Sequence, residues 1–333
     1  MDQHPRILVA TDNLRDQING VAVTFKHLAI QAENSGYQMH FIDPSQFWNF
    51  SFPAYKEIKL ALPYGISRKI ESIRPDYIHI ATEGPIGLAT KLYCDRNNIA
   101  YNTSYHTKFP EYLKLYRIPV DLTYRYMRWF HKHSGVVLTT TERMCELLKT
   151  KQFESPVIPW TRGVDRSNIK PRTNKTLNVK PIVLYVGRVS PEKNLEELLK
   201  LQNKYYIIVV GDGPSRVELE SKYRNAMFVG YKTGEELFKY YAKADVFCFP
   251  SKTDTFGIVM IEAMSCGTPI AAYPIDGPLD IVEDGVTGFL GDDLNESIKK
   301  CLQLDRSKIV PESEKWTWEN CWCIFEKNLT RVN

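Results

Sequence analysis

The stretch that decides the fold is Pro181–Asn194, PIVLYVGRVSPEKN. Its first part, Ile182–Val186, is a short unbroken apolar run, which is typical of a strand buried on both faces. Gly187 ends the run. Ser190 then has the chemistry of a helix N-cap and Pro191 that of a first helical residue. A buried strand that leads directly into a helix is the repeating unit of a parallel α/β sheet, so this stretch predicts that fold class.

The same alternation of apolar runs and amphipathic helical segments extends on both sides of this stretch. Residues 20–34, for example, carry apolar side chains at helical spacing and are followed by Ser35-Gly36, a helix stop. The further predicted strands are residues 6–11, 37–43, 77–80, 99–105, 136–140, 206–210, 227–229, 246–249 and 269–272. The pattern predicts two doubly wound α/β domains, whose ligands bind beyond the carboxyl ends of the strands.

The alternation pauses once, in the polar and basic segment 165–181, which we interpret as an interdomain linker. A chain of 333 residues also exceeds the roughly 250–300 residues at which a single core usually divides. The predicted organisation is an N-terminal domain over 1–164, the linker over 165–181, a second domain over 182–311 and a C-terminal helix within 312–333. That helix has Trp318, Trp322, Phe325 and Leu329 at helical spacing.

The composition excludes several classes of protein. Hydrophobic residues make up 43% and charged residues 25%, which is ordinary for a globular protein, and the net charge of +4 lacks the clustered basic stripe of a nucleic-acid binder. No apolar run approaches the ~20 residues of a membrane span. The seven cysteines form no CxxC pair and no leader segment is apparent, so we expect reduced thiols and a cytoplasmic location. A peripheral membrane contact stays open, because residues 123–133 mix aromatic and basic side chains.

Several common catalytic motifs are missing. The sequence has neither a phosphate loop of the GxxxxGK[ST] type nor a GxSxG serine elbow. Gly211-Asp212-Gly213 follows a predicted strand, but Arg216 stands where a dinucleotide fingerprint needs its third glycine. No Asp-x-Asp pair exists to clamp a metal-bound phosphate, and His131-x-His133 has no third ligand nearby. We therefore expect neither a metal nor any other cofactor.

Two cations mark the first candidate site. Arg188 precedes the helix predicted after Ser190, and Lys193 lies in its first turn. Cations at a helix N-terminus oppose the helix dipole, and a bound anion resolves that conflict. Because a helix N-terminus, an Arg and a Lys together suit a diphosphate, we expect one here.

Two carboxylates mark the second candidate site, within residues 251–264. Asp254 precedes a predicted buried helix, and Glu262 interrupts its apolar run. Roughly six helical residues at ~1.5 Å each put the two carboxylates about 9 Å or more apart, too far to act on one atom. They are suited to gripping two ends of an extended ligand through its hydroxyl groups. The alternatives are that Asp254 caps the helix and that Glu262 pairs with a buried cation.

The N-terminal domain offers two further candidates. His106 follows the predicted strand that ends at Tyr105, and Gly20 opens the helix after the first strand. Each is of interest because of its place after a strand, where ligands of such sheets bind. A glycine at a helix start also allows a phosphate to approach the backbone.

These motifs together resemble glycosyltransferase family 4, the retaining GT-B enzymes. The matching segments, in chain order, are NGVAVT, SYHTKFPEY, RGVD, GRVSPEKN, GDGP, DTFGIVMIEAMSCGTPI and EDGVTGFL. NGVAVT and SYHTKFPEY are most similar to the branch of bacterial α-mannosyltransferases and plant sulfolipid synthases. The resemblance implies two Rossmann-like domains facing each other across a cleft, and the last helix crossing back to the first domain.

The resemblance also implies a nucleotide-sugar donor, no metal, and retention at the anomeric carbon. Arg188 and Lys193 would hold the diphosphate, Glu262 the ribose, and Gly20 would approach the phosphates. Asp254, with Thr255, Phe256 and Gly257, would hold the donor sugar, and His106 would lie near the reacting carbon. The nucleotide base would lie near Gly211, Gly213, Tyr231 and Lys232. Asp254 departs from the family pattern, which usually has Glu at this position.

The expected function is transfer of a hexose, mannose from GDP-mannose first, to a glycan or lipid acceptor that the sequence does not identify. UDP-glucose is the nearest alternative donor. A nucleotide-sugar 2-epimerase and a sugar-nucleotide-binding protein without turnover would suit the same architecture, and the sequence leaves both open.

Overall fold

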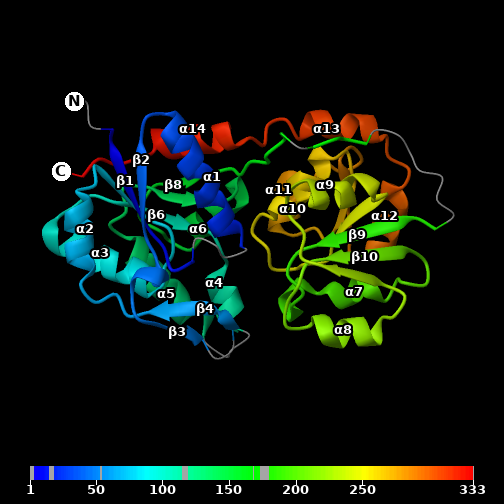
Figure 1. The fold of residues 1–333 in the computed structure, drawn as a ribbon, viewed down its shortest axis with the longest axis horizontal. Helices are drawn as coiled ribbons and strands as arrows, with labels where there is room; N and C mark the ends of the chain where they lie inside the picture. Colours follow the sequence, from blue (N-terminus) through cyan, green and yellow to red (C-terminus); the bar gives the residue numbers. More distant parts are fainter. Residues whose placement is uncertain are drawn as a thin grey trace. The chain divides into compact units, whose positions relative to one another are not determined.

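The computed structural model describes residues 4–14, 19–52, 55–114, 119–167, 169–172 and 180–332, and it divides into two compact units (Figure 1). The first unit comprises Met1–Arg162 together with Trp318–Asn333, and the second comprises Gly163–Thr317. Each unit is built on one six-stranded parallel sheet. The predicted class, two doubly wound parallel-sheet domains, is confirmed. Much of the predicted linker, residues 168 and 173–179, lies outside the described residues.

The sheet of the first unit has the strand order β2-β1-β5-β6-β7-β8. Its strands are β1 (Arg6–Ala10), β2 (Gln38–Ile42), β5 (Tyr77–Ile80), β6 (Asn102–Tyr105), β7 (Val137–Thr139) and β8 (Val157–Pro159). The helices of this unit are α1 (Gly20–Asn34), α2 (Ile66–Ile73), α3 (Pro85–Asn97), α4 (Phe109–Lys114), α5 (Val120–His131), α6 (Glu142–Thr150) and α14 (Trp318–Lys327). Strand β8 is not among the predicted strands, because it is short and proline stands at both of its ends, at Pro156 and Pro159.

Strand β1 shows why this unit is covered on both faces. Ile7 and Val9 point to a core shared with α1 and α14, whereas Leu8 and Ala10 point to a core on the opposite face. All four side chains are fully buried, because alternate residues of a strand face opposite sides of a sheet. The unbroken apolar run in the sequence follows from this double cover.

The C-terminal helix α14 packs against α1, and Figure 1 shows the two side by side at opposite ends of the colour scale. Trp318, Trp322 and Phe325 are buried in this contact. His27 of α1 stacks on Trp318 with ring centroids 4.4 Å apart. The last helix is thus part of the first unit, and its apolar residues at helical spacing supply one wall of that unit's core.

An antiparallel hairpin, which the sequence pattern does not predict, lies between β2 and α2. It consists of β3 (Asn49–Phe52) and β4 (Tyr55–Ala61), with Asn49 opposite Ala61 and Phe50 opposite Leu60. Ala61 is buried in the unit's core. Because neighbouring residues alternate between faces, Phe50 lies on the other, outward face, and it is 44% exposed.

The sheet of the second unit has the strand order β11-β10-β9-β12-β13-β14. Its strands are β9 (Ile182–Val186), β10 (Tyr206–Val210), β11 (Met227–Gly230), β12 (Val246–Phe249), β13 (Ile270–Ala272) and β14 (Gly288–Leu290). Its helices are α7 (Leu195–Leu199), α8 (Arg216–Lys222), α9 (Gly234–Lys243), α10 (Ile258–Ser265), α11 (Asp276–Ile281), α12 (Leu294–Cys301) and α13 (Ile309–Glu312). Strand β14, another run of three residues, is also absent from the predicted strands.

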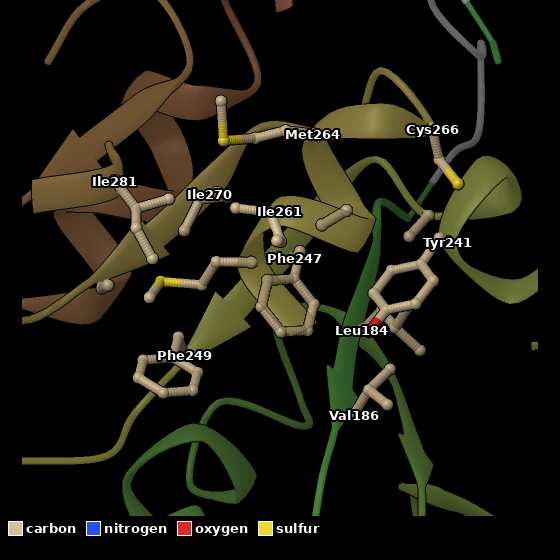
Figure 2. Packing of buried hydrophobic residues seen from close by; sticks show 14 of the residues in the cluster. Leu184, Val186, Tyr241, Phe247, Phe249, Ile261, Met264, Cys266, Ile270 and Ile281 are labelled. Atoms are coloured by element: carbon tan, nitrogen blue, oxygen red, sulfur yellow. The ribbon is translucent and has the colours of Figure 1, made fainter. Parts of the chain in front are cut away.

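One face of this second sheet is packed by α10 and α9 (Figure 2). Leu184 and Val186 of β9 meet Phe247 and Phe249 of β12 there, beneath Ile261 of α10. The opposite face of β9 contributes Val183 and Tyr185 to a separate core. This packing holds the ends of β9 and β12 next to each other, and the candidate site is built on the loops that follow them.

Candidate functional site

The strand order of the second sheet reverses its direction between β9 and β12. Strands β10 and β11 extend the sheet on one side of β9, and β13 and β14 extend it beyond β12. In a doubly wound sheet, the loops that leave such a switch point at the carboxyl ends of the strands diverge and leave room for a ligand. The loop after β9 carries Arg188 and Lys193, and the loop after β12 carries Asp254. Three of the predicted site residues thus follow the two strands at the switch point.

The loop after β9 differs from the predicted helix start. Pro191–Lys193 form a single 3-10 turn, Asn194 adopts a left-handed conformation with φ 53°, and α7 begins only at Leu195. Ser190 occupies the N-cap position of this turn but makes no side-chain cap hydrogen bond, and its hydroxyl donates to Glu192 Oε1 at 2.5 Å. Lys193 therefore does lie in a helical turn that begins after Ser190, as predicted, but the turn is a single 3-10 turn and not the start of an α-helix. Lys193 closes a tight turn instead, and this turn directs its side chain toward the neighbouring loop.

Lys193 forms an ion pair with Asp254. Its Nζ lies 2.6 Å from Asp254 Oδ1 and 2.9 Å from Oδ2, and each side chain is about one quarter exposed. Asp254 is not the N-cap of α10, since that position belongs to Gly257, with φ 89°. The helix-cap alternative for Asp254 is therefore wrong, and its carboxylate neutralises the cation from the neighbouring strand's loop.

The backbone around Arg188 is held by a buried tyrosine. Tyr185 of β9 is 1% exposed, and its hydroxyl donates to the carbonyl oxygen of Arg188 at 2.7 Å. Burial raises the pKa of Tyr185, and the carboxylates of Asp254 and Glu192 raise it further, so the phenol stays protonated as the donor. This bond fixes the turn that presents the guanidinium of Arg188.

Glu262 lies on α10, and its partner is a tyrosine of α9. The hydroxyl of Tyr241, which is fully buried, donates to Glu262 Oε2 at 2.7 Å. Burial raises the pKa of Glu262, and the Tyr241 hydrogen bond opposes that shift. The alternative interpretation expected a buried cation as the partner of Glu262, but its partner is the phenol of Tyr241. Tyr231 lies close enough for the Glu262 carboxylate to raise its pKa, although burial has the larger effect.

The segment Thr255–Gly257 leads from Asp254 into α10. The side chain of Phe256 is 4% exposed and packs edge-on against Trp316, with ring centroids 5.5 Å apart. It belongs to the core, so only the backbone of this segment is suited to contacting a ligand. Thr255 is also buried.

Gly211 and Gly213 bring the loop after β10 against the loop after β9. A Cβ on Gly211 would lie 1.9 Å from the carbonyl oxygen of Gly187, and one on Gly213 would lie 2.4 Å from that of Val189. These two glycines therefore have a structural role in the backbone contact between the loops. Lys232, after β11, is paired with Glu236 of α9 at 2.6 Å.

In the first unit, Gly20 is the first residue of α1 and is exposed. Asn19 caps this helix, because its side-chain oxygen accepts from the backbone N–H of Ala22 at 2.9 Å. The N-terminus of a 15-residue helix is a favourable place for an anion. The predicted helix start and the exposed glycine are thus both present.

His106 directly follows β6 and is held by Arg162, which follows β8. Arg162 Nη2 lies 2.9 Å from His106 Nδ1. The His106 ring also packs with the rings of Phe25 and Trp160, whose centroids are 6.1 Å and 5.7 Å away. Burial lowers the pKa of His106, and the charge of Arg162 lowers it further. The imidazole is therefore neutral at physiological pH.

Three residues that hydrogen-bond to predicted site residues are not identifiable from the sequence. Arg162 belongs to the segment RGVD, which carries part of the family resemblance, but the resemblance assigns it no role. Tyr185 and Tyr241 give no signal beyond their apolar surroundings. Their hydroxyl contacts, with Arg188 and Glu262, depend on tertiary packing that spacing along the chain does not encode.

The described residues contain no cluster of three or more His, Cys, Asp or Glu side chains able to hold a metal ion. Among the helices described, none is both long and apolar enough to cross a membrane.

Comparisons with known proteins agree with this architecture. A family model described as "Glycosyltransferase Family 4" matches residues 18–168, and one described as "Glycosyl transferases group 1" matches residues 166–310. The solved structure of a sucrose-phosphate synthase from Thermosynechococcus elongatus superimposes with a TM-score of 0.77 at 17% identity, covering 97% of this chain and 98% of that one. This likeness shows the GT-B fold.

Two relatives are similar over most of this chain. A sulfoquinovosyl transferase of Arabidopsis thaliana is 29% identical over 304 residues, which cover 81% of this chain and 60% of that protein. A GDP-mannose-dependent alpha-mannosyltransferase of Mycobacterium tuberculosis is 26% identical over 315 residues, which cover 86% of this chain and 83% of that protein. The chain therefore spans less than two thirds of the plant relative's length. With two family models that together extend from residue 18 to residue 310, the chain belongs to glycosyltransferase family 4.

Proposed function

We propose that this protein is a retaining glycosyltransferase that transfers a hexose, mannose from GDP-mannose, to a glycan or lipid acceptor. The observation that carries the proposal is the pairing of Lys193 with Asp254 at the switch point of the second sheet. The ammonium of Lys193 suits a diphosphate, and the carboxylate of Asp254 suits sugar hydroxyls. A nucleotide sugar has a diphosphate on one side of its glycosidic bond and sugar hydroxyls on the other.

The proposed donor contacts follow from the chemistry of each side chain. Arg188 and Lys193 bind the diphosphate, because charge-assisted hydrogen bonds from cations to phosphate are the strong ones. Glu262 accepts from the ribose hydroxyls, with its carboxylate oriented by Tyr241. Asp254 and the backbone of Thr255–Gly257 bind the sugar. Gly211, Gly213, Tyr231 and Lys232 are proposed to surround the nucleotide base.

The first unit is proposed to contribute Gly20 and His106. The exposed Gly20 at the start of α1 allows a phosphate to approach the helix N-terminus. His106 orients the donor sugar near its reacting carbon. These two assignments rest on the family resemblance and on the positions of both residues after sheet strands.

The proposed mechanism is attack by the acceptor from the face that the diphosphate leaves. The departing phosphate oxygen accepts the acceptor's proton, so the new glycosidic bond forms as the old one breaks and the configuration is kept. Arg188 and Lys193 then stabilise negative charge that grows on the leaving group, where preorganised charge lowers a barrier most effectively. Two cations at this position also support turnover without a divalent metal.

A donor and product assay tests this function. Calorimetric titration with GDP-mannose, UDP-glucose, GDP and UDP identifies the bound nucleotide, and proton NMR of the product reports its anomeric configuration. The proposal expects GDP-mannose to bind most tightly and an α-linked product. A product of inverted configuration would contradict the retaining mechanism, and selective consumption of UDP-glucose would replace the proposed donor.

The same assay separates the transferase from an epimerase and from a binding protein. A 2-epimerase would convert the donor into a new free sugar or sugar nucleotide without any acceptor. A binding protein without turnover would hold the donor and leave it intact over days, without even slow hydrolysis.

We also propose a cytoplasmic location with peripheral contact to an anionic membrane surface, through the β3–β4 hairpin and the residues that flank it. Four large apolar side chains there are strongly exposed: Trp48 at 71%, Phe50 at 44%, Leu62 at 52% and Tyr64 at 96%. Basic Arg68, on the following helix α2, is exposed nearby in sequence. Aromatic side chains with neighbouring cations favour a membrane interface with anionic lipids.

Flotation with vesicles tests this contact. Vesicles that contain phosphatidylglycerol should carry the protein, whereas phosphatidylcholine vesicles should carry less. Trp48→Ala should reduce flotation, and Tyr206→Ala, at an exposed aromatic of the second unit, is the matched control. Equal flotation of Trp48→Ala and the native protein would exclude this surface.

A further inference from the structure

Arg162 is a buried cation whose hydrogen-bond partners are neutral. It is only 3% exposed, and Nη1 donates to the carbonyl oxygens of Trp160 and Thr161 at 2.7 and 2.8 Å. Its guanidinium carbon lies 4.5 Å from the centroid of the Trp160 ring. Within the described parts of the chain, no carboxylate forms an ion pair with it. Burying a charge without an opposite charge is costly, so its position calls for an explanation.

The remaining contact of Arg162 points to that explanation. Nη2 donates to Nδ1 of His106 at 2.9 Å. A guanidinium has five N–H donors and no acceptor, so Nδ1 of His106 must present a lone pair. A neutral imidazole carries one hydrogen, which therefore lies on Nε2. Burial lowers the pKa of Arg162 to about 10, so the guanidinium remains charged at physiological pH.

The support of this contact is rigid. Trp160, on which the guanidinium stacks, is fully buried, and its Nε1 donates to the carbonyl oxygen of Cys321 in α14 at 3.0 Å. Its backbone N–H donates to Thr139 of β7 at 2.6 Å. Through Trp160, the guanidinium of Arg162 is thus held against the sheet and the last helix of the same unit.

We propose that Arg162 is a positioning residue that holds His106 as the neutral Nε2–H tautomer. The inference rests on the proposed function, in which His106 orients the donor sugar. As that sugar loses its diphosphate, positive charge develops at its anomeric carbon. A protonated imidazole would oppose this charge, whereas a neutral ring donates one hydrogen bond from Nε2 without adding charge.

The charged and titratable groups that face His106 come from three elements. Besides Arg162, they are His79 of β5 and His131 of α5, and each of the three lowers the pKa of His106. His79 shares a hydrogen bond with Ser104 at 2.5 Å, and His131 lies 2.7 Å from Thr103. Arg162, by contrast, donates directly to the His106 ring. Removing its charge and its N–H donor should therefore alter the tautomer and the titration of His106 together.

Nitrogen NMR of the full chain, labelled with 15N-histidine, tests the inference. His106 is assigned from the resonances lost in His106→Gln. The native protein should show a pyridine-like Nδ1 and a pyrrole-like Nε2 between pH 8 and pH 5. Arg162→Met should average the two nitrogens and raise the pKa of the ring above its native value, although burial still holds that pKa below the ordinary value. Arg162→Lys, which retains one cationic donor, should restore the native pattern.

Steady-state kinetics provide a second test, because loss of the positioning of His106 should change kcat and leave KM for the donor nearly unchanged. With saturating donor, kcat of Arg162→Met should begin to fall at a higher pH than kcat of the native protein, with little change in donor KM. Circular dichroism checks that each variant is folded. If Arg162→Met does not fold, the native spectrum alone still decides the tautomer.

The outcomes separate this inference from the proposed function. A pyrrole-like Nδ1 in the native protein, or an unchanged His106 spectrum in folded Arg162→Met, would overturn the inference even if transfer occurs. The expected tautomer in a protein that transfers no sugar would leave the role of Arg162 toward His106 standing and overturn the proposed function.

Discussion

Lys193 and Asp254, 61 residues apart in the chain, are joined by two short contacts of 2.6 and 2.9 Å between the ammonium and both carboxylate oxygens. The pair bridges the loops of β9 and β12, which are neighbours at the switch point of the second sheet. We propose that the diphosphate and sugar of a bound donor take the place of this mutual contact. Since each residue now satisfies the other, donor binding must exchange one ion pair for two sets of ligand contacts.

Removing either cation should weaken diphosphate binding. Arg188→Ala and Lys193→Ala should each raise the Kd for GDP roughly 10- to 100-fold, because each removes a charge-assisted hydrogen bond of about 1.5–3 kcal/mol. Calorimetry measures the change, and Lys200→Ala, an exposed lysine paired with Glu197, is the matched control. Native GDP affinity in both site variants would show that the diphosphate binds elsewhere.

Removing the charge of Asp254 should have opposite effects on diphosphate binding and on transfer. Asp254→Asn frees Lys193 from its counter-charge, so GDP should bind at least as tightly as to the native protein. Turnover of the nucleotide sugar should fall, because the carboxylate that binds the sugar hydroxyls is lost. Weaker GDP binding in a folded Asp254→Asn protein would argue that the ion pair serves to build the diphosphate site.

Tyr241→Phe should weaken donor binding through Glu262. The native phenol donates to the Glu262 carboxylate at 2.7 Å and thereby opposes the rise in its pKa on burial. Without that bond the pKa of Glu262 should rise further. Nucleotide affinity should therefore fall about 2- to 10-fold at neutral pH, and its loss on acidification should begin at a higher pH. Tyr240→Phe, on the same helix, is the control, and identical pH profiles of the two variants would contradict this role.

Transfer should proceed without divalent metal. Arg188 and Lys193 supply two positive charges for the leaving diphosphate, which is the task a bound cation performs in metal-dependent enzymes. Rates measured after extensive dialysis against EDTA should equal those with added Mg²⁺ or Mn²⁺. A rate that disappears in chelator and returns with either ion would refute this expectation.

Stability should decline in mild acid because of His79. Burial lowers the pKa of His79 to about 3 in the folded protein, far below the ordinary value of about 6.5. Below pH 6.5 His79 binds a proton in the unfolded chain but not in the folded chain, so the free energy of unfolding falls as pH decreases. From pH 7.5 to pH 5.5 this residue alone accounts for about 1.4 kcal/mol. Urea unfolding at both pH values should show a correspondingly smaller loss in His79→Gln, and an equal loss would count against it.

Local patterns along the chain are sufficient to predict the class of fold. Unbroken apolar runs such as Ile182–Val186 are buried on both faces, and their alternation with helical periodicity leaves a parallel sheet as the arrangement that satisfies both. Five predicted strands have bounds close to those observed in each unit. The short strands β8 and β14 are not predicted, because prolines stand at both ends of β8 and β14 begins with Gly288.

The hairpin β3–β4 is not predicted from the sequence for a different reason. Residues Asn49–Phe52 do alternate polar and apolar side chains, but only over four positions, and Phe50, an apolar member of that alternation, is 44% exposed. The helix after β9 also starts later than its sequence predicts. Ser190 and Pro191 do start a helical turn, but it is a single 3-10 turn, and Asn194 in a left-handed conformation separates it from α7.

The sequence predicts where the candidate site residues lie relative to the strands. A strand-loop-helix unit places residues that follow a strand at one edge of a sheet, and this applies to Arg188, Lys193, Asp254, Glu262 and His106. The sequence does not predict their partners. Lys193 meets Asp254, Tyr241 meets Glu262 and Arg162 meets His106 across 61, 21 and 56 residues. Hydrogen-bond partners of this kind depend on strand order and on how helices pack over the sheet. Neither follows from periodicity along the chain, so the protonation and orientation of these side chains emerge only when the sheet is assembled.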